Sequence, residues 1–146
     1  MAAGTQATGS ILVTGGSKGI GLAIARRFHA EGFTTIVCAR NAASLEDARA
    51  SMPGLQAFEC DMTRTGDVAS LADSVRELVG TPDVLVNNAG AFVPGQLHAE
   101  DDSALDAMLA ANLFSAYRIT RALLPMLMIV PDPRAIIPGS SARVMR

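Results

Sequence analysis

The chain has 146 residues, 49% of them hydrophobic, and a formal net charge of -2 at pH 7. This length fits one domain that can bury a core, while the acidic balance and the few aromatic residues argue against nucleic-acid binding. The longest apolar run, 123–130, contains Pro125 and is too short to cross a bilayer. We therefore expect a cytoplasmic protein without a membrane partner, with a flexible leader over 1–9 and one domain over 10–146.

Strand-like and helix-like segments alternate along the chain. Short apolar runs predict strands at 10–13, 34–38, 56–59, 83–87 and 135–137. Helical spacing predicts helices from about 22 to the glycine at 32, and over 44–51, 67–79 and 103–127. The strands are continuously apolar, which is typical of a parallel sheet covered on both faces. We predict an α/β fold, a Rossmann-type doubly wound parallel sheet that is truncated after its fifth strand.

The two cysteines each end an apolar run. Cys38 and Cys60 share no ligand spacing with His29 or His98, so the sequence predicts no metal site. We expect both thiols to be small buried side chains in a reducing compartment.

The first turn between a strand and a helix reads T-G-G-S-K-G-I-G over 14–21. Gly15 permits the tight turn, Gly19 lets the backbone approach a pyrophosphate, and Gly21 allows close packing of the helix. The helix that starts here would direct its free N–H groups and positive dipole end at phosphates. A glycine triplet in this position predicts a dinucleotide site.

This G-x-x-x-G-x-G spacing resembles the short-chain dehydrogenase/reductase family, and further motifs follow in the order that the family shows. They are Asp61 after the third strand, Asn87-Asn88-Ala89-Gly90 after the fourth, Asn112 in the fifth helix, and Ser140-Ser141 after the fifth strand. The stretch N-L-F-S-A-Y-R-I-T-R-A-L-L-P-M over 112–126 looks like 3-oxoacyl-carrier-protein reductases and sepiapterin-type reductases.

The resemblance implies roles for the matched positions. Asp61 would hydrogen-bond the adenine amino group, and residues 88–90 would line the ribose. Asn112 would hold a proton-relaying water, and Ser141 would bind the substrate carbonyl or hydroxyl. By residue type alone, Asp61 could equally be a turn or helix-cap residue, and Asn112 could cap a helix irregularity. The expected catalytic residues are Asn112 and Ser141, and the expected cofactor-binding residues are Gly15, Ser17, Lys18, Gly19, Ile20, Gly21, Arg40, Asp61, Met62, Asn88, Ala89 and Gly90.

Charge near the second strand predicts which cofactor is bound. Members of the family that prefer NAD carry an acidic residue where this chain has Ala39, and Arg40 follows it. Lys18 in the glycine turn would face the same 2′-phosphate, which suits an Arg fork and a Lys point charge. Each charge-assisted hydrogen bond contributes about 1.5–3 kcal/mol. Two of them predict NADP(H) rather than NAD(H).

The family also has a Tyr-x-x-x-Lys pair after its serine, where the tyrosine is the general acid. Here the chain runs S-S-A-R-V-M-R to Arg146 without that pair, and Pro138-Gly139 departs from the usual residues before the serines. Tyr117 and Arg121 form a Y-x-x-x-R pattern, but this spacing simply places them on one helical face.

We therefore predict the cofactor-binding part of an NADPH-dependent carbonyl reductase or alcohol dehydrogenase, with little turnover alone and a homo-oligomeric state. The alternatives are a non-catalytic paralogue that binds NADP(H) or a partner subunit, and a truncated remnant.

Overall fold

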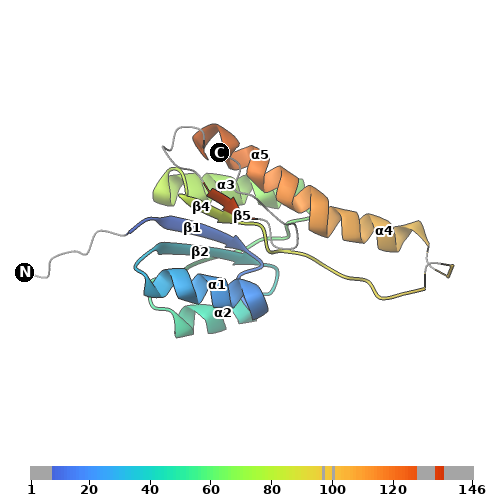
Figure 1. The fold of residues 1–146 in the computed structure, drawn as a ribbon, viewed down its shortest axis with the longest axis horizontal. Helices are drawn as coiled ribbons and strands as arrows, with labels where there is room; N and C mark the ends of the chain where they lie inside the picture. Colours follow the sequence, from blue (N-terminus) through green and yellow to red (C-terminus); the bar gives the residue numbers. More distant parts are fainter. Residues whose placement is uncertain (1–7, 97, 100, 128–133, 137–146) are drawn as a thin grey trace, which may run out of the picture.

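A computed structural model describes residues 8–96, 98–99, 101–127 and 134–136. Its centre is a parallel sheet with the strand order β3-β2-β1-β4-β5, and Figure 1 shows β1 between β2 and β4. The strands are β1 (Ser10–Thr14), β2 (Thr34–Ala39), β3 (Gln56–Glu59), β4 (Val84–Val86) and β5 (Arg134–Ile136). The predicted α/β fold with a Rossmann-like parallel sheet is confirmed.

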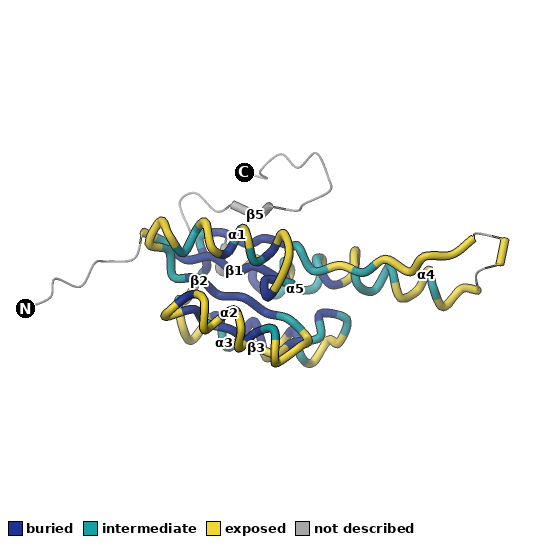
Figure 2. The backbone as a smooth tube through the Cα atoms, turned by 90° about the horizontal axis from the view of Figure 1, so that it is seen from below, coloured by how far each residue is buried: buried dark blue, intermediate teal, exposed yellow. Residues whose placement is uncertain are grey.

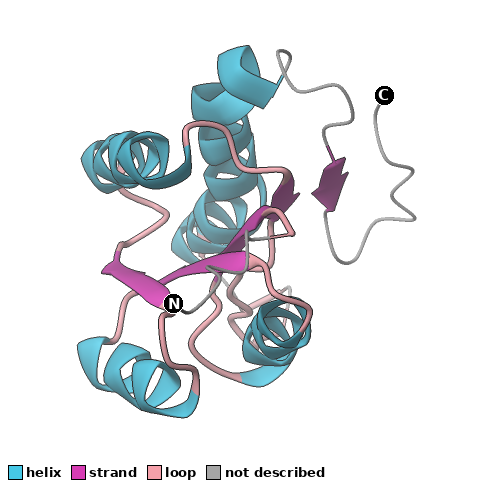
Figure 3. Ribbon diagram, turned by 90° about the vertical axis from the view of Figure 1, so that its left-hand side faces the viewer, coloured by secondary structure: helices cyan, strands magenta, loops and turns pink. Residues whose placement is uncertain are grey.

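Helices cover both faces of this sheet (Figure 3). They are α1 (Gly19–Ala30), α2 (Ala42–Ser51), α3 (Thr65–Val79), α4 (Asp102–Leu109), the π-helical turn η1 (Ala110–Phe114) and α5 (Ser115–Leu127). Buried residues of α1 and α2 pack on one face, and those of α3 and α5 on the other. Helix α4 has no buried residue and projects beyond the sheet (Figures 1 and 2).

The core lies in two layers, one on each face of the sheet. Every residue of β1 is buried, and Figure 2 shows the central strands dark blue. Leu12 packs toward Leu71 and Ile119, whereas Val13 packs with Leu45 on the opposite face. Side chains alternate between the faces of a strand, so a continuously apolar strand supplies both layers. This explains why continuous apolar runs predicted the parallel sheet correctly.

The predicted elements differ from the observed ones mainly at their ends. Helix α2 starts at Ala42 because the Asn41 side chain caps it, accepting a 2.8 Å hydrogen bond from the Ser44 N–H. Strand β4 ends at Val86, where the chain turns and the Asn88 N–H donates a 3.1 Å hydrogen bond to the Val86 carbonyl. Gly32 follows α1 with φ +82°, as expected of a glycine that ends a helix. Residues 1–7 of the expected leader and the last residue of the expected fifth strand lie outside the described residues.

The predicted helix over 103–127 is interrupted by η1. The Ser115 N–H donates to the carbonyl of Ala110, five residues back. Two side chains donate hydrogen bonds to nearby backbone carbonyls of this helix. Ser115 Oγ donates to Ala111 O at 2.6 Å, and Asn112 Nδ2 donates to Met108 O at 2.9 Å. Such back-bonding perturbs the helical ladder and favours a π turn. The alternative that Asn112 caps a helix irregularity agrees with this geometry.

Candidate functional site

A cavity of about 300 Å³ lies at the carboxyl ends of β1, β2, β3 and β4. The strand order reverses between β1 and β4, and ligands of open α/β sheets bind at such a switch point. The lining residues are Gly15, Ser17, Lys18, Cys38, Ala39, Arg40, Asn41, Ser44, Cys60, Asp61, Met62, Thr63, Asn88, Ala89, Gly90, Ala91 and Ala111.

The glycine turn between β1 and α1 is closely packed on one side and open on the other. Gly15 and Gly19 have φ values of +65° and +56°, which disfavour other residues. A Cβ on Gly21 would lie 2.4 Å from the Gly15 carbonyl oxygen, so only glycine lets α1 approach the turn. A Cβ on Gly19 would meet nothing within 4 Å. No side chain caps α1, so its N-terminus fits an anionic group.

Thr14 ties the glycine turn to the segment after β4. Its Oγ1 accepts hydrogen bonds from the N–H groups of Asn88 at 3.1 Å and Ala89 at 3.0 Å. In the opposite direction, the side-chain amide of Asn88 donates hydrogen bonds to the carbonyls of Thr14 and Gly15, both at 3.1 Å. These bonds hold the two walls of the cavity at a fixed separation.

Asp61 is half-buried in the wall beyond β3. Its Oδ1 accepts from the Thr63 N–H at 2.9 Å and from Thr63 Oγ1 at 2.7 Å. The backbone hydrogen bond is the main cause that lowers the pKa of Asp61, and the nearby charges of Arg40 and Arg64 add to it. Arg118 Nη1 of α5 donates to the Thr63 carbonyl at 2.9 Å. Asp61 is therefore ionised at neutral pH and held by a turn that α5 supports.

Two cationic side chains, Lys18 and Arg40, line the cavity from the ends of β1 and β2. Both are exposed, and neither side chain forms an ion pair or a hydrogen bond with the described part of the chain. Beside them, Ser44 Oγ of α2 donates to Ser17 Oγ at 2.9 Å, which joins the start of α2 to the glycine turn. The cavity thus combines an uncapped helix N-terminus with two cations that are available to an anion.

Asn112 does not line the cavity but positions a residue that does. Its Oδ1 accepts from the Ala91 N–H at 3.1 Å, and its Nδ2 donates to the Ala91 carbonyl at 2.7 Å. Gly90 must be small here, because a Cβ would lie 2.5 Å from Asn112 Oδ1. Tyr117, which starts the Y-x-x-x-R pattern, is 60% exposed and outside the cavity.

The structure brings most of the expected site residues together. Those that line the cavity are Gly15, Ser17, Lys18, Arg40, Asp61, Met62, Asn88, Ala89 and Gly90. Gly19, Gly21 and Asn112 lie beside the cavity and shape the turn or the loop, whereas Ile20 is exposed in the first turn of α1. Ser141 and its neighbour Ser140 lie outside the described residues.

Several cavity residues were not anticipated from the sequence. Asn41 and Ser44 form a recognisable N-cap pattern, N-x-x-S before a helix, that could have placed them at the start of α2. Thr63 follows the expected Asp61 in a D-x-T pattern, which is typical of an Asx turn. No local sequence pattern predicts the contact of Ala91 with Asn112, because it depends on how η1 packs against the segment after β4.

Comparison with known proteins identifies the family. Residues 10–143 match the family model described as short chain dehydrogenase. The chain belongs to the short-chain dehydrogenase family. The resemblance seen in the glycine turn and the N-N-A-G segment is thereby confirmed.

Several relatives are close enough to compare directly. L-fucose dehydrogenase of Bos taurus is 35% identical over 129 residues, which cover 87% of this chain and 48% of that protein. The 3-oxoacyl-[acyl-carrier-protein] reductase MabA of Mycobacterium tuberculosis (strain ATCC 25618 / H37Rv) is 36% identical over 112 residues, covering 77% and 42%. The Pseudomonas aeruginosa RhlG/NADP active-site complex superposes with a TM-score of 0.84 at 30% identity, covering 97% of this chain and 59% of that one.

The chain thus spans about half the length of the curated relatives it matches. At least one structural relative, RhlG, binds NADP. None of the helices in the described part of the chain is both long and apolar enough to span a membrane.

Proposed function

We propose that this chain binds NADP(H) in the cavity at the switch point and forms the cofactor-binding unit, residues 10–146, of an oxidoreductase. The reaction would move hydride between NADPH and a carbonyl or alcohol, in keeping with the small-molecule substrates of the family. The observation that carries the proposal is the pair Lys18 and Arg40 beside the glycine turn, two cations that form no ion pair in the described part of the chain.

The phosphate end of the cofactor would be held by the glycine turn. Positive φ at Gly15 and Gly19 and the free space at Gly19 allow the backbone to approach a pyrophosphate. The uncapped N-terminus of α1 adds N–H donors and a favourable dipole, and its first turn has no acidic side chain to repel an anion.

The adenosine end would lie between the ends of β2 and β3. Arg40 offers a planar fork to the 2′-phosphate and Lys18 a point charge. Asp61 keeps one carboxylate oxygen, Oδ2, without a hydrogen-bond partner in the described part of the chain, and this oxygen could accept from the adenine amino group. Asn88 to Gly90 would line the ribose, with Asn88 already held by Thr14.

Bound NADPH would supply the hydride, whereas the proton chemistry would depend on Asn112 and Ser141. Asn112 would act from the π turn, where its side chain is fixed on Ala91. The sequence has one tyrosine, Tyr117, which is exposed and is followed four residues later by Arg121 rather than lysine. We therefore propose that these 146 residues by themselves bind NADP(H) but turn over little.

Cofactor selectivity tests this proposal. Arg40→Asp should weaken NADPH binding by about 10- to 200-fold, since one charge-assisted hydrogen bond of about 1.5–3 kcal/mol is lost, and should change NADH binding far less. Arg121→Asp, on the exposed surface of α5 outside the cavity, is the matched control and should change neither. Equal losses for both cofactors in the Arg40 variant would show that the charge argument is wrong.

Self-association follows as a second part of the proposal. Leu105, Leu113, Phe114 and Tyr117 are between 44% and 60% exposed along α4, η1 and α5. An apolar surface of this kind favours burial against another subunit. Sedimentation should show an oligomer, and a monodisperse monomer at micromolar concentration would contradict this part of the proposal.

A further inference from the structure

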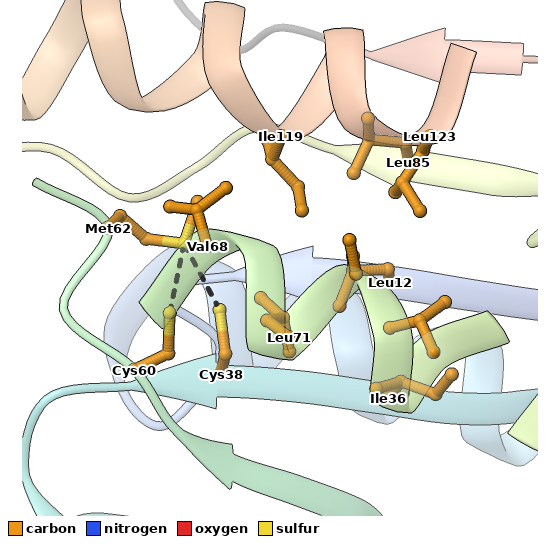
Figure 4. Packing of buried hydrophobic residues seen from close by; sticks show 12 residues of the cluster. Leu12, Ile36, Cys38, Cys60, Met62, Val68, Leu71, Leu85, Ile119 and Leu123 are labelled. Atoms are coloured by element: carbon orange, nitrogen blue, oxygen red, sulfur yellow. Dashed lines mark hydrogen bonds between the residues drawn. The ribbon is translucent and has the colours of Figure 1, made fainter. Parts of the chain in front are cut away.

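Three sulfur atoms meet in the wall of the cavity, at the carboxyl ends of β2 and β3 (Figure 4). Cys38 Sγ lies 3.7 Å from Met62 Sδ, and Cys60 Sγ lies 3.6 Å from the same atom. All three residues line the cavity, although they also belong to the core layer beneath it. We call this group the sulfur triad.

The backbone holds the sulfur triad in place. Cys38 is part of β2 and stands beside Phe58 of β3 in the parallel register. The Cys60 N–H donates to the Ala39 carbonyl at 3.0 Å, so the pairing of the two strands continues to Cys60. The three residues are at most 6% exposed. Two thiols and a thioether are therefore pre-positioned by a rigid sheet.

The two thiols also interact with each other. Their mutual interaction lowers the pKa of Cys60 and raises that of Cys38. They are the only cysteines of the chain, and neither forms a disulfide. Two thiol sulfurs that lie within 3.7 Å of one thioether sulfur form a soft donor set.

We propose that the sulfur triad is a binding site for a soft monovalent metal ion of the Cu⁺ and Ag⁺ class. Thiolate and thioether ligands select such ions over Mg²⁺, Ca²⁺ or Mn²⁺. With a metal–sulfur bond of about 2.3 Å, the length of a zinc–thiolate bond, the corners of a planar trigonal site lie about 4 Å apart. The observed separations of 3.6 and 3.7 Å need to open by only a few tenths of an ångström.

Charge and protons balance in this site. Each thiol releases its proton to solvent as its sulfur–metal bond forms, so two thiolates, the neutral thioether and a monovalent ion give a complex of net charge −1. Lys18 and Arg40 line the same cavity and partly offset that charge, whereas the carboxylates of Asp61 and Asp67 near Cys60 oppose it. Because two protons leave, the affinity should rise with pH.

A metal ion bound to the sulfur triad should also compete with NADPH binding, an expectation that rests on the proposed function. Cys60 and Met62 flank Asp61 in sequence, and Cys38 precedes Ala39 and Arg40 at the end of β2. The metal would therefore sit where the adenosine end is expected to bind. A bound ion and NADPH should exclude each other.

A titration with silver nitrate in chloride-free buffer tests the metal site directly. We expect one Ag⁺ per chain by native mass spectrometry, an ultraviolet thiolate-to-metal charge-transfer band, and loss of reactivity of both thiols toward a thiol reagent. Cys38→Ser should weaken the band, because one of the two thiolate ligands is lost. Met62→Leu should weaken binding at least tenfold, because the third ligand is lost while the volume is kept.

Met52→Leu is the matched control, since Met52 is 3% exposed in the core layer on the opposite face of the sheet. Its Ag⁺ affinity should equal that of the unaltered chain. Equal affinities of the Met62 and Met52 variants would overturn the site, and so would an Ag⁺ stoichiometry that leaves the thiols reactive.

Competition with NADPH separates this proposal from the proposed function. We expect NADPH to lower the apparent Ag⁺ affinity of the unaltered chain. Simultaneous binding of both would refute the overlap of the two sites. Absence of NADPH binding together with one tightly bound Ag⁺ would refute the proposed function and leave the sulfur triad standing.

Discussion

Replacement of Thr14 by valine exchanges one hydroxyl for a methyl group, yet it should clearly lower the free energy of unfolding. The hydroxyl of Thr14 accepts hydrogen bonds from the N–H groups of Asn88 and Ala89 and lies in a side chain that is 1% exposed. Valine has nearly the same shape and a good strand propensity. The main change is therefore the loss of that acceptor, together with the long hydrogen bond that the hydroxyl donates to the Val86 carbonyl at 3.4 Å. The Asn88 N–H keeps its bond to the Val86 carbonyl, so only the Ala89 N–H is left without an acceptor. An unsatisfied buried donor costs about 1–3 kcal/mol, which is the loss of stability that we expect.

Urea denaturation followed by circular dichroism measures this loss, with an unchanged slope showing that the folded state stays compact. The control is Thr35→Val in β2, which is equally buried but donates a single hydrogen bond, to the Phe33 carbonyl at 3.1 Å. It should cost less than about 1 kcal/mol, because only one bond of about that net strength is lost. If both variants lost the same stability, the reasoning that Thr14 joins the two cavity walls would be refuted.

Three further perturbations act on other parts of the cavity. Gly21→Ala should abolish tight NADPH binding and lower the urea midpoint, since its Cβ would lie 2.4 Å from the Gly15 carbonyl oxygen; an unaltered midpoint would contradict this. Asp61→Asn should be less stable than the unaltered chain at neutral pH. The pKa of Asp61 in the folded state is lowered from 3.8, so the difference in free energy of unfolding between the two chains should be complete above pH 3.8 and should vanish as the pH falls through the lowered pKa. Urea titrations in acid that still show the difference would contradict this prediction. Arg118→Met should weaken NADPH binding several-fold by releasing the turn that holds Asp61, whereas Arg121→Met should not, and calorimetric affinities that fall equally would disprove the link.

The order of the elements could be predicted from the sequence because it depends on local patterns. Continuous apolar runs marked the buried strands, and Gly32 marked the end of α1. The glycine turn could be placed for the same reason, since Gly15 needs a positive φ whatever the rest of the chain does. Of the alternatives for Asp61, the turn role is confirmed by its bonds to Thr63, while its contact with adenine stays a prediction.

Features that depend on packing between distant segments could not be predicted. The π turn at η1 contains neither glycine nor proline, and it arises with the contact of Asn112 to Ala91 across the cavity edge. The sulfur triad escaped a search for ligand spacing, because Met62 joins Cys38 only when β2 and β3 pair. Long-range register, rather than local sequence, decides both.

The most direct test of the account is a titration of the purified chain with NADPH and with NADH, followed by the fluorescence of the reduced nicotinamide. The chain has no tryptophan, so its own emission is low. The account predicts saturable binding with a clear preference for NADPH, reduced by Arg40→Asp. No binding of either cofactor, or equal affinity for both, would contradict it.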